Sequence, residues 1–166
     1  MSDSPTRQEA LDKIAELITD CRVGLLTTID ADGLPWSRPM GRQGDGFDGT
    51  VAFLTAADTE KVDAIEARSA AGVVFARPED QAYVTLAGRA EVSNDREAIR
   101  AAWNEDARAW YPEGPDDPSL RLIRFEAERG EYWDSPSSMI VYAIGYAKAV
   151  LSGEPLMLGE NAKVEL

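Results

Sequence analysis

Apolar side chains recur at helical spacing in the first 20 residues, which predicts an N-terminal helix with one buried face. Ser4 stands where an N-cap would, and Pro5 suits the first helical turn, where its missing N–H costs nothing. We therefore expect residues 1–20 to form a surface helix. Its buried stripe is expected to contain Leu11, Ile14, Ala15, Leu17 and Ile18.

The pattern then changes to the β type. Residues 21–29 are rich in β-forming side chains, "DADG" is a strong turn signal, and residues 34–43 follow at hairpin distance. Residues 50–55 form a short apolar run typical of a buried strand, and residues 56–69 return to a helical period. The first half of the chain is thus predicted to be a helix, three strands and a second helix.

The second half continues with strands. Residues 71–93 predict two strands around a "RPEDQ" turn, in which Gly88 indicates a bulge or a close backbone approach. A helix is expected over residues 96–110, a Pro- and Gly-rich loop over 111–118, and one or two strands over 120–134.

The end of the chain has a weaker pattern. Residues 137–153 show helical spacing, and the remaining tail has no clear period, so we expect a C-terminal helix and tail over 137–166. Short antiparallel strands dominate, and the helices do not alternate regularly with them. The sequence therefore predicts an α+β fold, mainly β: an antiparallel barrel with peripheral helices in one domain over residues 1–166.

Charge narrows the choice of partners. The 166 residues include 17 basic and 30 acidic side chains, a net charge of −13, and the sequence pI is about 4.4. Such a chain repels polyanions, so we expect it to bind neither nucleic acid nor an anionic membrane surface. The single Cys21 and a start without the features of an export signal favour a cytoplasmic protein.

The chain contains no His, which removes the commonest general base and metal ligand. One Cys also rules out thiolate-rich metal ligation within one chain, so no metal site is predicted, although an all-carboxylate site stays open with 30 acids. If the protein is an enzyme, a cofactor is expected to carry the chemistry.

Two basic residues stand at unusual places. Arg38 lies on the strand over residues 34–43, on the same side as Met40, and Lys61 lies in the first turn of the helix that follows Thr55. With Asp58 as N-cap, this turn has unpaired N–H groups and a positive field. A simpler interpretation is that both charges are solvated. Because the short connection between the strands brings both residues together, we predict a phosphate cradle.

Aromatic residues supply the other candidates. Trp133 in "EYWDSP" either fills the core or stacks on a flat ligand. Trp110 and Tyr111, which precede a rigid loop in "AWYPEGPDDP", allow the same stacking role or a dimer contact.

The motifs "SRPM", "FLTAADTEK", "YVTLAGRAEV", "AWYPEGPDDP" and "EYWDSP" occur in an order and spacing that resemble a known family. This family is the bacterial general stress protein branch of the pyridoxamine 5'-phosphate oxidase-like superfamily. The resemblance covers about residues 10 to 152. It implies a split β-barrel that forms a homodimer and binds FMN in clefts between the two subunits.

The resemblance also implies roles for individual residues. Arg38 would contact the flavin phosphate and ribityl chain, Thr59 and Lys61 would hold the phosphate, and Trp133 would reach the flavin from the partner subunit. Pro39 and Met40 would present backbone to the ring, next to the pair that ends the following strand. The full implied cofactor-binding set is Arg38, Pro39, Met40, Leu54, Thr55, Thr59, Lys61 and Trp133.

The chain departs from the family pattern at three places. Glu60 stands where the oxidases commonly have Arg, and Tyr83 takes the place of a Gln that often faces the ring. After "EYWD" the oxidases have an Arg and a His that grip the substrate phosphate, whereas residues 135–140 here read "SPSSMI". We therefore predict that this protein is not a competent pyridoxamine phosphate oxidase.

Several functions stay open on the sequence. One is an FMN-dependent oxidoreductase of unknown substrate, which is compatible with the lack of His because flavin redox chemistry needs no protein nucleophile. Another is a non-catalytic flavin-binding stress protein that acts as a carrier, buffer or sensor. FAD or a deazaflavin is a less favoured cofactor, haem is disfavoured without a His ligand, and Glu60 leaves open that the cofactor has been lost.

Overall fold

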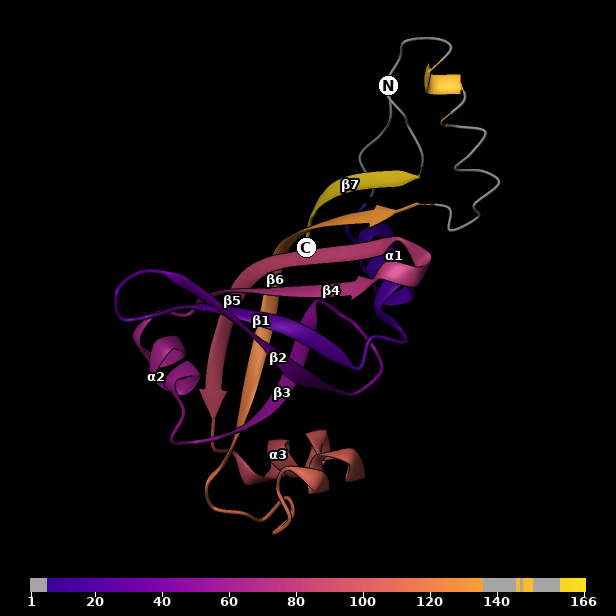
Figure 1. Ribbon diagram of the computed structural model, residues 1–166. Helices are drawn as coiled ribbons and strands as arrows, with labels where there is room; N and C mark the ends of the chain where they lie inside the picture. The colour runs from indigo at the N-terminus through magenta and orange to yellow at the C-terminus, as the bar shows by residue number, and fades with distance from the viewer. Residues whose placement is uncertain (1–5, 136–145, 147, 151–158) are drawn as a thin grey trace.

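The computed structural model describes residues 6–135, 146, 148–150 and 159–166. Its centre is a closed antiparallel barrel, in which the strands follow the order β3–β2–β1–β4–β5–β6 and β6 pairs back with β3 (Figure 1). This arrangement confirms the predicted mainly β fold with peripheral helices. The strands are β1 Val23–Ile29, β2 Pro35–Gln43, β3 Thr50–Ala56, β4 Ala70–Arg77, β5 Ala82–Ser93, β6 Leu120–Asp134 and β7 Glu160–Glu165.

Strand β7 corrects the sequence analysis, which predicted no regular element in the tail after residue 153. It pairs antiparallel with the upper part of β6 outside the closed ring, and Val164 is buried there. Tyr132 of β6 donates a hydrogen bond to the Glu160 carboxylate at 2.8 Å, and burial together with this contact raises the pKa of Tyr132 to about 12. Most of the helix predicted over residues 137–153 lies outside the described residues, although Tyr146 and residues 148–150 are helical.

The helices surround the barrel. They are α1 Arg7–Ile18, α2 Glu60–Ala67 and α3 Arg96–Ala102, with two short 3₁₀ segments, η1 Pro78–Asp80 and η2 Glu105–Ala109. The cap of α1 is Thr6 rather than Ser4, and it forms a reciprocal capping box with Glu9. The helix predicted over residues 96–110 is broken, because Trp103 is extended and the Asn104 side chain caps η2.

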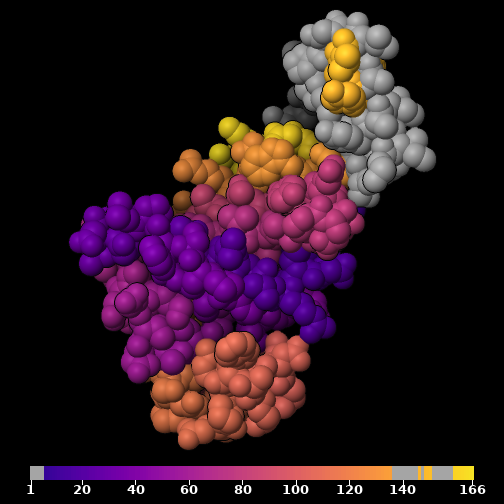
Figure 2. Space-filling model, viewed as in Figure 1, coloured from indigo at the N-terminus to yellow at the C-terminus, as the bar shows by residue number. Residues whose placement is uncertain are grey.

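Two apolar clusters hold these elements together. The larger fills the barrel with side chains such as Phe53, Phe75 and Phe125, and the buried stripe of α1 belongs to it. The smaller joins α3 and η2 to the ends of β3 and β6 through residues such as Ile99 and Leu120. In Figure 2 the α3–η2 segment (salmon) forms the lower end of the molecule, below the indigo and purple strands.

The bulge predicted at Gly88 is present, since the register between β5 and β6 shifts between Ala87 and Gly88. A Cβ atom at position 88 would overlap the carbonyl oxygen of Glu126 on β6. The glycine is therefore required by the close approach of two backbones, as the sequence pattern indicated. Among the described residues, we find no helix with the length and apolar character needed to cross a membrane.

Candidate functional site

Two basic side chains and three hydroxyls meet where β1, β2 and β3 approach the start of α2. Arg38 Nη1 donates to Thr28 Oγ1 at 2.7 Å. Lys61 Nζ donates to Thr55 Oγ1 at 3.2 Å, and Thr55 Oγ1 lies 3.5 Å from Thr59 Oγ1. We call these five residues the basic notch. The structure thus brings together the predicted residues Arg38, Thr55, Thr59 and Lys61, and it adds Thr28.

The start of α2 differs from the prediction by one residue. The N-cap is Thr59, not Asp58, and its side chain makes no capping hydrogen bond. Instead, the Thr59 hydroxyl donates to the carbonyl oxygen of Ala56 at 3.1 Å, which turns its oxygen toward Thr55. Glu60 and Lys61 are therefore the first two helical residues, where the field of the helix attracts an anion.

The notch carries positive charge that no ion pair in the described part of the chain neutralises. Among the described residues, the ion pairs within 4.0 Å include neither Arg38 nor Lys61. Burial lowers the pKa of Lys61, and the positive charge of Arg38 lowers it further, while Glu60 acts in the opposite direction. Burial also lowers the pKa of Arg38, again against the effect of Glu60. The two cations thus repel each other, and the fold supplies only partial compensation.

Arg42, which lies on the same side of β2 as Arg38, has a different role. Its guanidinium is buried and donates to the carbonyl oxygens of Ile18, Asp45 and Gly46 at 2.7–2.8 Å. It also lies 5.9 Å from the ring centre of Phe75. Arg42 is therefore a structural clamp between α1 and the β2–β3 turn, and Arg38 alone on this strand serves the notch. Trp36 is 62% exposed, so it does not share the buried environment of Met40 and Arg42 on the same strand.

A cavity of about 330 Å³ opens beside the notch, and it contains most of the remaining predicted residues. Pro39 and Met40 of β2 line it together with Leu54 and Thr55 of β3 and Lys61 of α2. The cavity therefore continues from the cationic end at Lys61 onto an apolar surface. Its other lining residues are Val23, Gly41, Gln43, Ala107, Trp110 and Tyr111.

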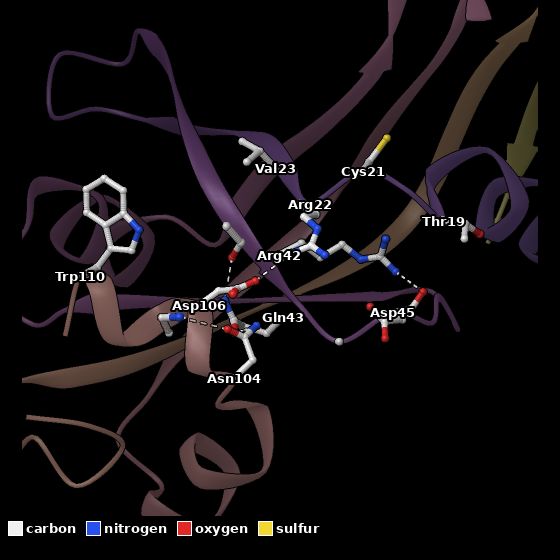
Figure 3. Close-up of a pocket in the computed structure, with 13 residues that line it drawn as sticks. Thr19, Cys21, Arg22, Val23, Arg42, Gln43, Asp45, Asn104, Asp106 and Trp110 are labelled. Atoms are coloured by element: carbon white, nitrogen blue, oxygen red, sulfur yellow. Dashed lines mark hydrogen bonds and ion pairs between the residues drawn. The ribbon is translucent and has the colours of Figure 1, made fainter. Parts of the chain in front are cut away.

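One wall of this cavity is formed by η2 and the two aromatic residues that follow it. Tyr111 Oη donates to the carbonyl oxygen of Leu54 at 3.2 Å, and Trp110 is 81% exposed at the rim. A second cavity of about 370 Å³ adjoins the first and shares Trp110 with it (Figure 3). Two contacts cross it, Arg22 to Asp106 at 2.8 Å and Asn104 to Gln43 at 2.9 Å.

Some lining residues had no signal in the sequence. Val23 and Gln43 look like ordinary strand residues, and only the pairing of β1 with β2 places them at the cavity. Thr28 is likewise identified only by the structure: it is completely buried and lies diagonally across β1–β2 from Arg38, whose direct register partner is Leu26. By contrast, Trp110 and Tyr111 stood out as aromatics before a rigid loop.

Trp133 does not join the notch within one chain. It pairs with Tyr83 of β5 and Asn161 of β7. Thr55 pairs with Arg121, twelve residues earlier on β6, a separation of about 40 Å along an extended strand. The role implied for Trp133 thus requires a second copy of the chain, and it stays a prediction.

Comparisons with known proteins agree with this architecture. The sequence model of the family described as pyridoxamine 5'-phosphate oxidase like matches residues 9–156. General stress protein 26 of Bacillus subtilis (strain 168) is 29% identical over 125 residues, which cover 74% of this chain and 86% of that protein.

Two solved structures illustrate the likeness of the fold. A general stress protein 26 candidate from Jannaschia sp. CCS1 has a TM-score of 0.76 at 29% identity, with 96% of this chain and 99% of that chain covered. A pyridoxamine 5'-phosphate oxidase-related, FMN binding protein from Nostoc punctiforme PCC 73102 has a TM-score of 0.62 at 18% identity, with 80% and 85% covered.

The chain therefore belongs to the pyridoxamine 5'-phosphate oxidase like family, and general stress proteins 26 are among its relatives. Its closed antiparallel barrel is the split β-barrel of its structural neighbours. The resemblance found in the sequence motifs is thus confirmed.

The charge of Lys61 is expected to weaken the fold when no anion is present. Because its pKa is lowered in the folded state, the protonated amine destabilises the fold at any pH below that lowered pKa. The penalty disappears as the pH rises toward the ordinary value of 10.5. Lys61→Met should therefore raise the melting temperature at neutral pH, with a gain that shrinks close to pH 10.5.

Lys13→Met is the matched control, because the hydrogen bond with Asp134 raises the pKa of Lys13. This substitution should lower the melting temperature, since the stabilisation by Lys13 is fully present below 10.5 and is lost only as the pH passes its raised pKa. Thermal unfolding followed by circular dichroism measures both variants. A loss of stability in Lys61→Met at neutral pH would contradict the conclusion that the charge of Lys61 destabilises the fold.

Proposed function

We propose that this protein binds FMN, with the phosphate in the basic notch and the ring system in the adjoining cavity, and that it acts as a flavin-dependent oxidoreductase. The observation that carries the proposal is the pair Arg38 and Lys61. Two partly buried cations repel each other, neither has an ion pair within 4.0 Å among the described residues, and Lys61 lines a cavity of about 330 Å³. A doubly charged phosphate supplies the missing anion.

The chemistry of the notch fits a phosphate monoester. The Arg38 guanidinium and the Lys61 amine would donate charge-assisted hydrogen bonds. The hydroxyls of Thr55 and Thr59, which donate to the carbonyl oxygen of Ala56 in the structure, would become further donors by turning toward the phosphate. The first turn of α2 adds its positive field from the same side. A phosphate thus replaces the repulsion between two cations with attraction to both.

The cavity suits the remainder of the flavin. Pro39, Met40 and Leu54 give it an apolar surface, and Tyr111 fixes the η2 wall through its bond to the Leu54 carbonyl oxygen. A bound flavin would supply electron transfer, which requires no nucleophile from the chain. The residues of the chain then bind and orient the cofactor and keep water from one side of it.

The family supports flavin binding in general, and a structural neighbour is described as FMN binding. That neighbour is 18% identical, so its structure supports the fold, and the choice of FMN rests on the notch. The substrate of the oxidases is not expected here, because Ser135 and the five residues after it include no cation for a second phosphate.

We further propose that the protein is a homodimer whose interface is the outer face of the barrel. Val23 and Leu25 of β1 are 55% and 44% exposed, and register places Leu25 opposite Pro39 of β2. Tyr83 and Trp133, paired across β5 and β6, alternate onto the same face. Because Val23 and Pro39 also line the cavity, a partner seated there would cover it and could bring its own Trp133 to the flavin.

The double variant Arg38→Ala/Lys61→Ala tests the phosphate site. Each charge-assisted hydrogen bond contributes about 1.5–3 kcal/mol, so FMN affinity should fall at least about a hundredfold. The dissociation constant is measured by quenching of flavin fluorescence. The control Arg89→Ala/Arg100→Ala removes the same charge from two exposed surface ion pairs and should bind FMN normally. Unchanged FMN affinity in the first variant would rule out the notch as the phosphate site.

The redox assignment is tested by mixing the FMN-loaded protein with NADH or NADPH under anaerobic conditions. The proposal predicts that the flavin absorbance is lost much faster than in the same concentration of free FMN. If the yellow colour persists with both donors, the protein is better described as a carrier, buffer or sensor of flavin.

The dimer is tested by mass in solution. The wild-type chain should elute at about 36 kDa, twice its 18.1 kDa. Leu25→Glu places a charge in the proposed interface and should give a monomer with weakened FMN binding. Leu34→Glu alters a residue that is 61% exposed in the β1–β2 turn and should leave the dimer intact. A monomeric wild-type protein would contradict the interface.

A further inference from the structure

Two large apolar side chains are exposed close to each other near the β1–β2 turn. Leu34 is 61% exposed and Trp36 is 62% exposed. Strand alternation places both on the face of the hairpin that carries the Arg38 side chain, whereas Leu25 and Pro39 of the proposed dimer interface lie on the opposite face. The proposed dimer interface therefore does not account for the exposure of Leu34 and Trp36.

A groove with a volume of about 570 Å³ lies beside these two side chains, between the β1–β2 turn and one face of α2. Both segments are found on the same side of the barrel (Figure 1). The Asp30 N–H donates to the Leu34 carbonyl oxygen at 2.9 Å, and Trp36 pairs with Thr28, which directly precedes the groove. The apolar part of the groove lining consists of Ile29, Ala31, Ala64 and Ala67.

The rest of the groove lining is mostly acidic. Four carboxylates and one guanidinium give it a formal charge of −3: Asp30, Asp32, Glu60, Asp63 and Arg68. Within the described part of the chain, none of these four carboxylates has an ion pair within 4.0 Å. The groove therefore combines unpaired acids with small apolar side chains.

The spacing along α2 explains how this face arises. Val62 and Ile65 turn toward the core and are buried. The groove residues of α2 follow one another at intervals of three, one and three positions, so they share a second face of the helix: Glu60, Asp63, Ala64 and Ala67. This second face carries its acids beside two alanines, which leave room for a chain that packs on the helix.

From this juxtaposition we infer that the groove, together with Leu34 and Trp36, is a docking surface for a basic segment of another protein, one that combines Lys or Arg with apolar side chains. The cations of the segment meet the unpaired carboxylates, and their aliphatic stems pack on Ala64 and Ala67. Its apolar side chains cover Leu34 and Trp36, and Trp is among the residues that contribute most to protein interfaces.

Other occupants match these features less well. A second copy of this chain carries the same net charge of −13 and is repelled, as are nucleic acids. Among the described residues, no three acidic side chains form a group that could hold a metal ion, so the carboxylates suit several separate cations better than one ion. A small polyamine would match the charges and would leave Leu34 and Trp36 exposed.

The experiment titrates the full chain with a short synthetic peptide of alternating Lys and Leu, by isothermal calorimetry at low ionic strength. Asp32→Asn/Asp63→Asn should weaken binding about fivefold, because exposed ion pairs each contribute little. Glu66→Gln/Glu79→Gln is the matched control. It removes the same charge from two exposed residues outside the groove and should bind the peptide as the wild type does.

The apolar part of the surface is tested with Leu34→Ser/Trp36→Ser. This variant should bind the Lys–Leu peptide at least about tenfold more weakly, and should bind a peptide of alternating Lys and Ser as the wild type does. Because both side chains are exposed, its melting temperature should stay close to that of the wild type.

The remaining outcomes would overturn the inference. Equal binding of the two peptides by the wild-type protein, or an equal loss of affinity in the Glu66/Glu79 control, would show that net charge alone attracts the peptide. Spermine bound as tightly as the Lys–Leu peptide would identify a site for small cations instead. Failure of the wild-type protein to bind the Lys–Leu peptide would likewise contradict the docking surface.

Discussion

The site depends on one unfavourable interaction, the electrostatic repulsion between Arg38 and Lys61. The fold fixes both residues: β2 carries the guanidinium, and the first turn of α2 carries the amine. Packing of Phe53 and Ile65 into the core holds these elements in place whether or not an anion is bound. Rigid elements therefore sustain a repulsion that flexible side chains on a loop would relax, and the binding of an anion converts it into attraction.

The net charge of the whole protein makes the local excess of positive charge in the notch necessary for binding an anion. A chain with a net charge of −13 repels anions at long range, so an anionic ligand is held only where cations outnumber acids locally. The notch, with Arg38 and Lys61 against the single carboxylate of Glu60, is such a place. Selective binding of a small dianion thus follows from a short-range cationic site in an acidic surface.

Strong periodicity made much of the fold predictable. The spacing of apolar residues indicated the buried stripe of α1 and the succession of strands along the chain. A glycine inside a strand indicated the bulge at Gly88. The cap of α2 was misplaced because Asp58 and Thr59 are both good capping residues. Strand β7 has only one buried apolar side chain, Val164, so it gave no clear alternation.

The sequence indicated the charged residues of the candidate site and, through the family resemblance, the cavity-lining residues Pro39, Met40 and Leu54. Arg38 and Lys61 stood out locally, whereas Thr28 and Gln43 became visible only through strand register. The most direct test of the account compares FMN with riboflavin, which differ by the phosphate alone. The account predicts that the wild-type protein binds FMN at least about a hundredfold more tightly. Equal affinity for the two compounds would show that the notch does not hold the phosphate, and would contradict the central claim.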